Sequence, residues 1–131
     1  MDVRVLYECN RLAFENGITF PETVRRLAAT GVERYTADLV QLQKTYYSAA
    51  GEVRTDLLPL GDRPAIAGRF DAPAVEEALA AIRQGRIDYP EFLRRVMRAG
   101  VASYSVHLAG RKAVYLGRGG DLHVEPFPGP G

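Results

Sequence analysis

The residues best suited to chemistry in this sequence are its only two histidines, His107 and His123, and the nearby carboxylate of Glu125. An imidazole beside a carboxylate can act as an acid–base pair, because histidine changes its charge near neutral pH. The same side chains can also bind a metal ion. We therefore take these three residues as the candidates for catalysis, although no complete catalytic motif assigns a reaction to them.

Two turns decide where the histidines lie. If Gly110-Arg111 and Arg118-Gly119 form two-residue hairpin turns, His107 lies opposite Val114, and Val114 lies opposite His123. Both imidazoles then share one face of a sheet, about 10 Å apart, because two strand spacings separate them. A change of one residue in either turn would exchange the faces.

A metal site on that face would need more than the two histidines. At such a separation His107 and His123 do not converge easily on one ion, and a third ligand would be required, with Glu125 or Asp38 the nearest. In the first part of the chain, Asp38 and Arg54 occupy the equivalent positions and could form a charge pair, which favours a structural use. We therefore expect no metal and no cofactor.

The same register sorts the strand residues onto two faces. We expect helices to cover the face that carries Tyr104, Val106, Leu108, Tyr115, Leu122 and Val124. The other face is mixed, and it holds the positions that we predict for ligand binding: Asp38, Tyr47, Arg54, His107, Leu116 and His123. This face also carries Val114, and it is more apolar than a fully solvated face needs, so we expect the other half, the connector, a second subunit or a ligand to cover it.

The elements that must position these residues occur twice in the chain. The motif Phe20-Pro21-Glu22 with Gly31 returns 69 residues later as Tyr89-Pro90-Glu91 with Gly100, which indicates an internal duplication. We predict an α+β fold made of two αα-βββ units with pseudo-twofold symmetry, antiparallel strands and four helices covering one face. We expect residues 1–131 to form one domain, with halves 1–59 and 71–128 joined by a connector at 60–70. One six-stranded sheet and two facing sheets both satisfy this pattern.

Capping residues and a change of period locate the elements. Thr19 and Asp88 each precede a glutamate by three residues, which predicts a capping box in which that glutamate bonds back to the N–H of the cap. Glu22 also stands four residues before Arg26, so helix ion pairing partly explains the Arg25-Arg26 pair. These signals predict helices over about 2–16, 19–31, 71–85 and 88–100, and strands over about 32–39, 45–47, 53–58, 101–108, 112–117 and 121–127.

The composition bounds the class of protein. The 131 residues suffice for one core but not for two, and 17 basic against 16 acidic side chains leave a net charge of +1. Such a balance does not favour binding to nucleic acid. Apolar runs fall short of the roughly 20 residues that a membrane span needs. Cys9 is the only cysteine, so no internal disulfide can form, and we expect a soluble protein of the cytoplasm.

The chain resembles a small bacterial family of unknown function, the YbcV-like proteins, which sometimes carry the label phage envelope protein. The resemblance is carried by the run from Tyr89-Pro90-Glu91 to Gly100-Val101, by Gly117-Arg118-Gly119-Gly120-Asp121 and by Glu125-Pro126-Phe127-Pro128-Gly129. It also includes Phe20-Pro21-Glu22, Gly31-Val32 and the stretch from Tyr46-Tyr47 to Gly51-Glu52, and so covers most of the chain. The resemblance implies no established catalytic residues.

These patterns favour a non-catalytic module that binds a small molecule or a protein at the seam between its two halves, where pseudo-symmetric folds place clefts. The alternative is a small enzyme with a His/Glu acid–base pair on the face away from the core. A third hypothesis is that a homodimer buries the apolar part of that face. The partners that we expect are a small molecule, a protein or a second copy of the chain, and neither nucleic acid nor a membrane.

Overall fold

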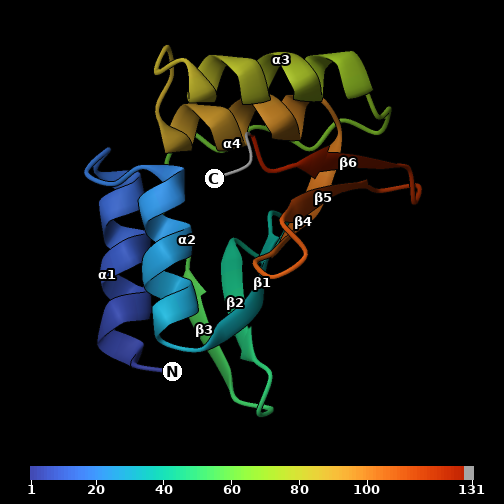
Figure 1. Cartoon of the computed structure of the whole chain (residues 1–131). Helices are drawn as coiled ribbons and strands as arrows, with labels where there is room; N and C mark the ends of the chain where they lie inside the picture. The colour runs from blue at the N-terminus through green and yellow to red at the C-terminus, as the bar shows by residue number, and fades with distance from the viewer. Residues whose placement is uncertain (129–131) are drawn as a thin grey trace.

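Two helices and three strands follow one another in the same order in each half of the chain. A computed structural model describes residues 1–128 (Figure 1). Its elements are α1 (Val3–Phe14), α2 (Phe20–Ala29), β1 (Val32–Asp38), β2 (Gln43–Ser48), β3 (Val53–Leu57), α3 (Ala72–Arg83), α4 (Tyr89–Arg98), β4 (Val101–His107), β5 (Lys112–Gly117) and β6 (Leu122–Pro126). The predicted α+β fold of two αα-βββ units is confirmed. Within residues 1–128, no helix combines the length and apolar character needed to cross a membrane.

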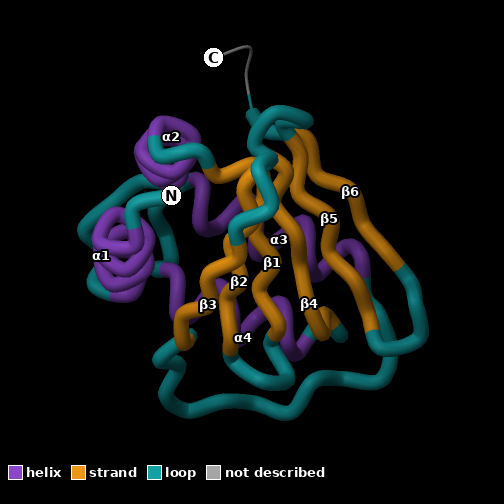
Figure 2. The backbone as a smooth tube through the Cα atoms, turned by 90° about the horizontal axis from the view of Figure 1, so that it is seen from below, coloured by secondary structure: helices purple, strands orange, loops and turns teal. Residues whose placement is uncertain are grey.

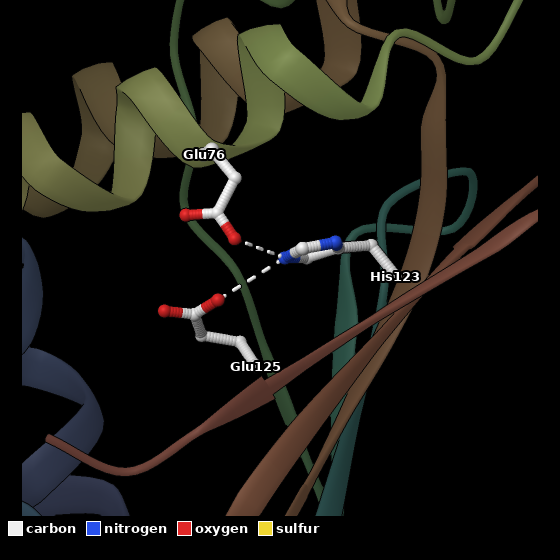
Figure 3. A group of neighbouring side chains, drawn as sticks. All are labelled: Glu76, His123 and Glu125. Carbon is white, nitrogen blue, oxygen red and sulfur yellow. Dashed lines mark hydrogen bonds and ion pairs between the residues drawn. The ribbon is translucent and has the colours of Figure 1, made fainter.

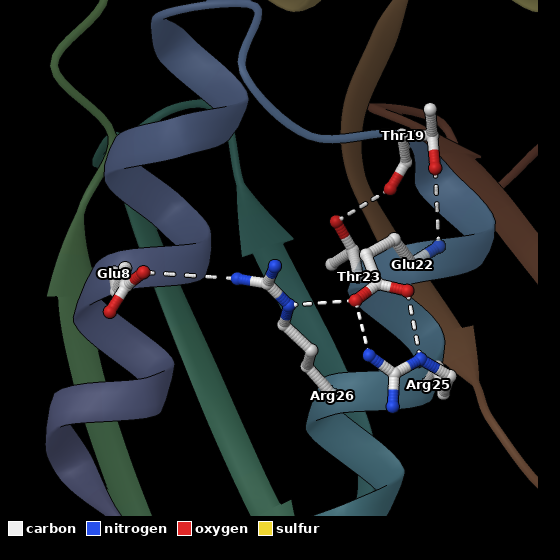
Figure 4. Close-up of polar contacts among 6 residues, drawn as sticks. All are labelled: Glu8, Thr19, Glu22, Thr23, Arg25 and Arg26. Carbon is white, nitrogen blue, oxygen red and sulfur yellow. Dashed lines mark hydrogen bonds and ion pairs between the residues drawn. The ribbon is translucent and has the colours of Figure 1, made fainter.

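Side-chain caps begin the helices where the sequence predicts them. The hydroxyl of Thr19 accepts a hydrogen bond from the backbone N–H of Glu22 at 3.3 Å, and Asp88 caps α4 in the same way. The carboxylate of Glu22 does not reach back to the cap as predicted. It accepts hydrogen bonds from Arg25 at 2.8 Å and Arg26 at 2.9 Å instead (Figure 4). The Arg25-Arg26 pair is thus accounted for within its own helix.

All six strands belong to one antiparallel sheet, so the alternative of two facing sheets is excluded. Their order is β3-β2-β1-β4-β5-β6, and β1 and β4 therefore meet at the centre and join the two halves. Thr36 and Ser105 occupy equivalent positions in the two halves, and their hydroxyls share a hydrogen bond of 2.8 Å across this central pair. The pseudo-twofold axis passes between these two strands.

The four helices cover one side of the sheet, as predicted. Figure 2 looks onto the strands, with α3 and α4 behind them. Alternate strand residues enter the core between the two layers, which contains Leu6, Leu27, Tyr35, Tyr46, Val75, Leu93, Val96, Tyr104 and Tyr115. We call the opposite side the open face, which carries Arg34, Thr36, Asp38, Gln43, Thr45, Tyr47, Val53, Thr55, Leu57, Ser103, Ser105, His107, Lys112, Val114, Leu116, Leu122, Val124 and Pro126.

The turn between β5 and β6 shifts these strands by one residue from the predicted register. The N–H of Gly117 donates to the carbonyl oxygen of Asp121 at 2.8 Å, and Gly120 has a φ of 90°. These features belong to a three-residue turn that ends in a glycine with positive φ, not to a two-residue turn. Tyr115 consequently pairs with His123.

A shift of one residue in each edge hairpin exchanges the faces of the two edge strands, β6 and β3. Leu122 and Val124, predicted for the core, lie on the open face and are 58% and 45% exposed. His123 and Arg54, predicted for the opposite face, lie on the side that the helices cover. Arg54 moves with its strand because Gly51 ends the β2–β3 turn with a φ of 92°, as the equivalent glycine does in the second half.

The connection between β4 and β5 also differs from the prediction, but without exchanging faces. His107 pairs with Lys112 and not with Val114, so residues 108–111 form a four-residue connection. A shift of two residues in register returns every side chain to the same face. The remaining residues predicted for the core are accordingly buried: Tyr104, Val106, Leu108 and Tyr115.

The connector at 60–70 packs against the end of α4. The N–H of Ala67 donates to the carbonyl oxygen of Met97 at 3.1 Å. The side chain of Arg94 donates to the carbonyl oxygen of Gly61 at 3.0 Å. A β-carbon at Gly100, which ends α4, would lie 2.3 Å from the carbonyl oxygen of Arg69. The connector is therefore held on the side of the helices, and Figure 2 shows it passing around the ends of the strands.

Candidate functional site

The structure divides the predicted site residues between the two faces of the sheet. The open face carries Asp38, Tyr47, His107 and Leu116, whereas the covered face carries Arg54, His123 and Glu125. The two histidines therefore lie on opposite sides. His123 and Glu125 are brought together, but on the side of the helices, so the placement of this pair on the face away from the core is wrong.

The middle of the open face is polar, and its charges are sorted by row. His107 pairs with Arg34 on one side and with Lys112 on the other, so three basic residues lie in one row across the strands. The guanidinium carbon of Arg34 lies 3.9 Å from the ring centre of Tyr47. Asp38 lies at the other end of β1, where its carboxylate accepts backbone hydrogen bonds of the following turn. The open face is thus basic along one row and acidic at the opposite end.

Apolar side chains occupy both sides of this polar band. We call them the apolar flanks: Tyr47, Val53 and Leu57 on β2 and β3, and Val114, Leu116, Leu122 and Val124 on β5 and β6. The four of them on the edge strands are between 45% and 66% exposed. Large contiguous apolar patches are uncommon on the free surface of a monomer and mark interaction sites.

A second cluster lies where α3 passes the edge strand β6 (Figure 3). Nε2 of His123 is 2.7 Å from Oε1 of Glu76 and 3.1 Å from Oε1 of Glu125. Arg83 approaches the other oxygen of Glu125 at 2.7 Å. The strand places His123 and Glu125 on one face because they are two residues apart, and Glu76 and Arg83 lie on one side of α3 because seven residues are about two helical turns.

The electrostatics of this cluster keep Glu125 ionised. Burial acts to raise the pKa of Glu125, which is 9% exposed, but its polar interactions with Glu76, His123 and Arg83 outweigh burial and hold its pKa below the ordinary value. An imidazole between two carboxylates can share a proton with them, or can join them in binding a cation that takes the proton's place.

Lys44 is a charged residue of the core for which the sequence suggested no role. It is 3% exposed, and its Nζ lies 4.5 Å from the ring centre of Tyr35 and 5.7 Å from those of Tyr46 and Tyr89. Burial lowers the pKa of Lys44 to about 8. Tyr89 belongs to the second half, so this amine lies at the seam under the helices. Cation–π contacts with the three tyrosine rings account for the burial of the Lys44 amine at this position.

Two surface depressions lie beside α1, within the first half of the chain. One, of about 360 Å³, separates α1 from α2 and is lined in part by Cys9. The other, of about 400 Å³, lies between α1 and β3 and is lined in part by Asn10. Burial raises the pKa of the Cys9 thiol, and a buried free cysteine packs like a small apolar residue. Neither depression is lined by Lys44 or by the cluster around His123.

Sequence reasoning missed Glu76, Arg83 and Lys44. The first two join the site only through the packing of α3 against β6, which no spacing along the chain encodes. Lys44 had a detectable signal, because it alternates with the core residue Tyr46 and its equivalent in the second half is the small residue Ala113.

No protein-family model matches this chain, and no curated protein matches it. The resemblance to the YbcV-like family therefore stays a prediction. The candidate sites depend on the geometry of the chain itself.

Proposed function

We propose that this protein is a non-catalytic protein-interaction module that binds through its open face. The observation that carries the proposal is that all four helices cover one side of the sheet, while the other side bears the two apolar flanks. Burying apolar surface contributes roughly 25 cal/mol per Å². The connector is held against α4 and so does not cover the open face, and we therefore expect a second molecule to bury this face. The seam between the halves, along β1 and β4, runs through the middle of this surface.

We take the occupant to be a second copy of the chain, because the charges of the open face complement one another. Arg34 and Asp38 lie four residues apart on β1, which is about 13 Å along the strand. A twofold axis across the strands, through Thr36, would place Arg34 of each copy against Asp38 of the other. An axis parallel to the strands would instead stack the basic row that contains His107 and Lys112 on itself, which like charges oppose.

The size of the surface predicts a weak dimer. Six strands about 4.8 Å apart and five residues with a rise of about 3.4 Å each give a face of roughly 29 by 17 Å. The two copies together would bury on the order of 1,000 Å², which is at the lower end for a specific interface. Association should therefore depend on concentration.

Sedimentation velocity over a concentration series tests the proposal. The wild-type chain should move from monomer to dimer, and Leu122→Glu and Leu57→Glu, one on each apolar flank, should stay monomeric because each would bury an unpaired charge. Val40→Glu is the matched control, since Val40 is 54% exposed but lies in the β1–β2 turn. This control should dimerise like the wild type.

A wild-type chain that stays monomeric at every concentration would contradict the proposal. Flank variants that dimerise as well as the wild type would contradict it too. Native mass spectrometry adds a second check, because a mass above a whole number of chains would indicate a bound small molecule in place of a protein partner.

Acid–base catalysis at His123 is the second candidate function, and the contact of 3.1 Å between its Nε2 and Glu125 favours it. A panel of small ester, amide and phosphate substrates tests it. His123→Ala should then abolish turnover, while His107→Ala, on the opposite face, should leave it unchanged. A wild-type chain without turnover on this panel would count against an enzyme.

We place the module in the cytoplasm. Its one cysteine, Cys9, is a buried free thiol, and the sequence offers no second cysteine for it to pair with inside the chain. Proteins of oxidising compartments commonly use disulfides, whereas cytoplasmic proteins keep their thiols reduced. Fractionation of cells that express the tagged chain would test this location.

A further inference from the structure

We infer that Glu76, His123 and Glu125 form a binding site for a divalent transition-metal ion such as Zn²⁺. One ligand atom from each of these residues lies within 4.8 Å of the other two. The three atoms come from α3 and β6 and converge at one point of the sheet edge (Figure 3). One imidazole nitrogen and two carboxylate oxygens are ligands that Zn²⁺ accepts.

The distances in the cluster are close to those of a metal site. Nε2 of His123 lies 2.7 Å from one carboxylate oxygen and 3.1 Å from the other. Ligands about 2.0–2.1 Å from a tetrahedral Zn²⁺ lie roughly 3.4 Å from one another. Small side-chain movements would therefore let an ion replace the direct contacts of His123 with Glu76 and Glu125, with the fourth position left to water.

Arg83 supports this geometry. Its guanidinium binds Oε2 of Glu125 at 2.7 Å, and the oxygen that faces His123 is Oε1. An outer partner that fixes a ligating carboxylate in this way is a usual feature of metal sites. When the imidazole is neutral, the two carboxylates and the one guanidinium together carry one net negative charge, which attracts a cation. The side chain of Glu76 is 50% exposed, which leaves the ion a path from solvent.

The internal duplication provides a comparison within the chain. The positions equivalent to Glu76, His123 and Glu125 in the first half are Tyr7, Arg54 and Asp56. A phenol, a guanidinium and one carboxylate do not form a site for a divalent cation, because the guanidinium offers no acceptor. The second half alone therefore carries the ligand set, and we expect one ion per chain.

Isothermal titration of the metal-free protein with Zn²⁺ alone tests this inference, and binding should saturate at one ion per chain. His123→Ala and Glu76→Gln should each weaken binding by about tenfold or more. His107→Ala is the matched control, because it removes the only other histidine, on the opposite face, and it should bind like the wild type. Glu76 is exposed, so Glu76→Gln keeps the test valid if His123→Ala fails to fold.

Co²⁺ provides an independent readout. A site with one nitrogen and two oxygen ligands plus water should give intense visible absorption bands, and these bands should vanish in Glu76→Gln. Zn²⁺ titration without saturable heat would overturn the inference. Loss of binding in His107→Ala equal to that in His123→Ala would overturn it as well, since the ion would then lie elsewhere.

Discussion

Tyr115 lies opposite His123 across β5 and β6, so the imidazole faces α3 and not the open face. This pairing depends on the three-residue turn that ends at Gly120. A two-residue turn would present His123 to the open face and bury Leu122 and Val124. One residue in one turn therefore determines both the apolar flank on β6 and the cluster that joins α3 to the sheet.

Gly100 and Gly31 occupy equivalent positions at the ends of α4 and α2, yet their substitution should have different effects. Both have positive φ, 96° and 92°, so alanine should cost about 1–2 kcal/mol of backbone strain at either position. At Gly100 the new β-carbon would also lie 2.3 Å from the carbonyl oxygen of Arg69, whereas at Gly31 it meets nothing within 4 Å. Gly100→Ala should therefore lower the free energy of unfolding by about 1–3 kcal/mol more than Gly31→Ala.

Urea denaturation of the two alanine variants measures this difference. Gly31→Ala serves as the internal control, because it carries the same backbone strain without the contact to the connector. Equal losses of stability would show that the connector moves aside at no cost.

Lys44 should destabilise the fold near neutral pH. Burial lowers its pKa to about 8 from the ordinary 10.5, so the unfolded chain binds more protons between these values, and the free energy of unfolding rises with pH across that window. The full effect is roughly 3 kcal/mol. Lys44→Met should raise stability at pH 7 by up to this amount and remove the rise above pH 8.

Urea denaturation at several pH values checks this prediction, with Lys112→Met as the control, since Lys112 is exposed and is the only other lysine. Burial raises the pKa of Tyr35 and Tyr46, so the folded chain holds protons that the unfolded chain releases, and stability should fall above about pH 10 in every variant. A wild-type stability that is flat between pH 8 and 10 would contradict the role of Lys44.

Glu22 should titrate at unusually low pH. Hydrogen bonds from Arg25 and Arg26 lower the pKa of its carboxyl to about 2 (Figure 4). Its depressed pKa favours the folded state above the ordinary value of 4.5, and this contribution is lost as pH falls towards 2. An NMR titration of the Glu22 side chain should give this pKa, and Arg26→Ala should raise it. An ordinary pKa in the wild type would mean that the ion pairs do not persist in solution.

The sequence predicted the four helices and all six strands because their signals are local. Thr19 and Asp88 mark helix starts through side-chain caps, and the alternation of Tyr35, Ala37 and Leu39 marks a strand with one covered face. Such signals need only a few neighbouring residues, whereas the duplication followed from the repeat at 69 residues and the single core from the length of the chain.

The predicted faces of the edge strands were wrong, and the cluster around His123 was not predicted. They depend on whether a turn contains two residues or three, and one residue reverses every side chain that follows. Gly51 and Gly120 occupy the same place in the two turns, and both have positive φ. This repeated glycine was the signal in the sequence that each turn contains three residues. Glu76 required the docking of α3, which is a property of the folded chain.

The proposed dimer can be tested directly by exchanging its paired charges between copies. Arg34→Asp should weaken self-association by about tenfold or more, because the introduced carboxylate of each copy would then face Asp38 of the other. Asp38→Arg should do the same by placing two guanidinium groups together. Mixing the two variants should restore a dimer, since each mixed pair contains two attractive contacts.

Native mass spectrometry of the mixture identifies the species, because the two variants differ in mass. Binding through the open face predicts weak or absent homodimers of each variant and an abundant mixed dimer. If the amount of mixed dimer in the mixture does not exceed the amount of homodimer that each variant forms alone, the result would contradict the pairing of Arg34 with Asp38. It would then also contradict the open face as the site of self-association.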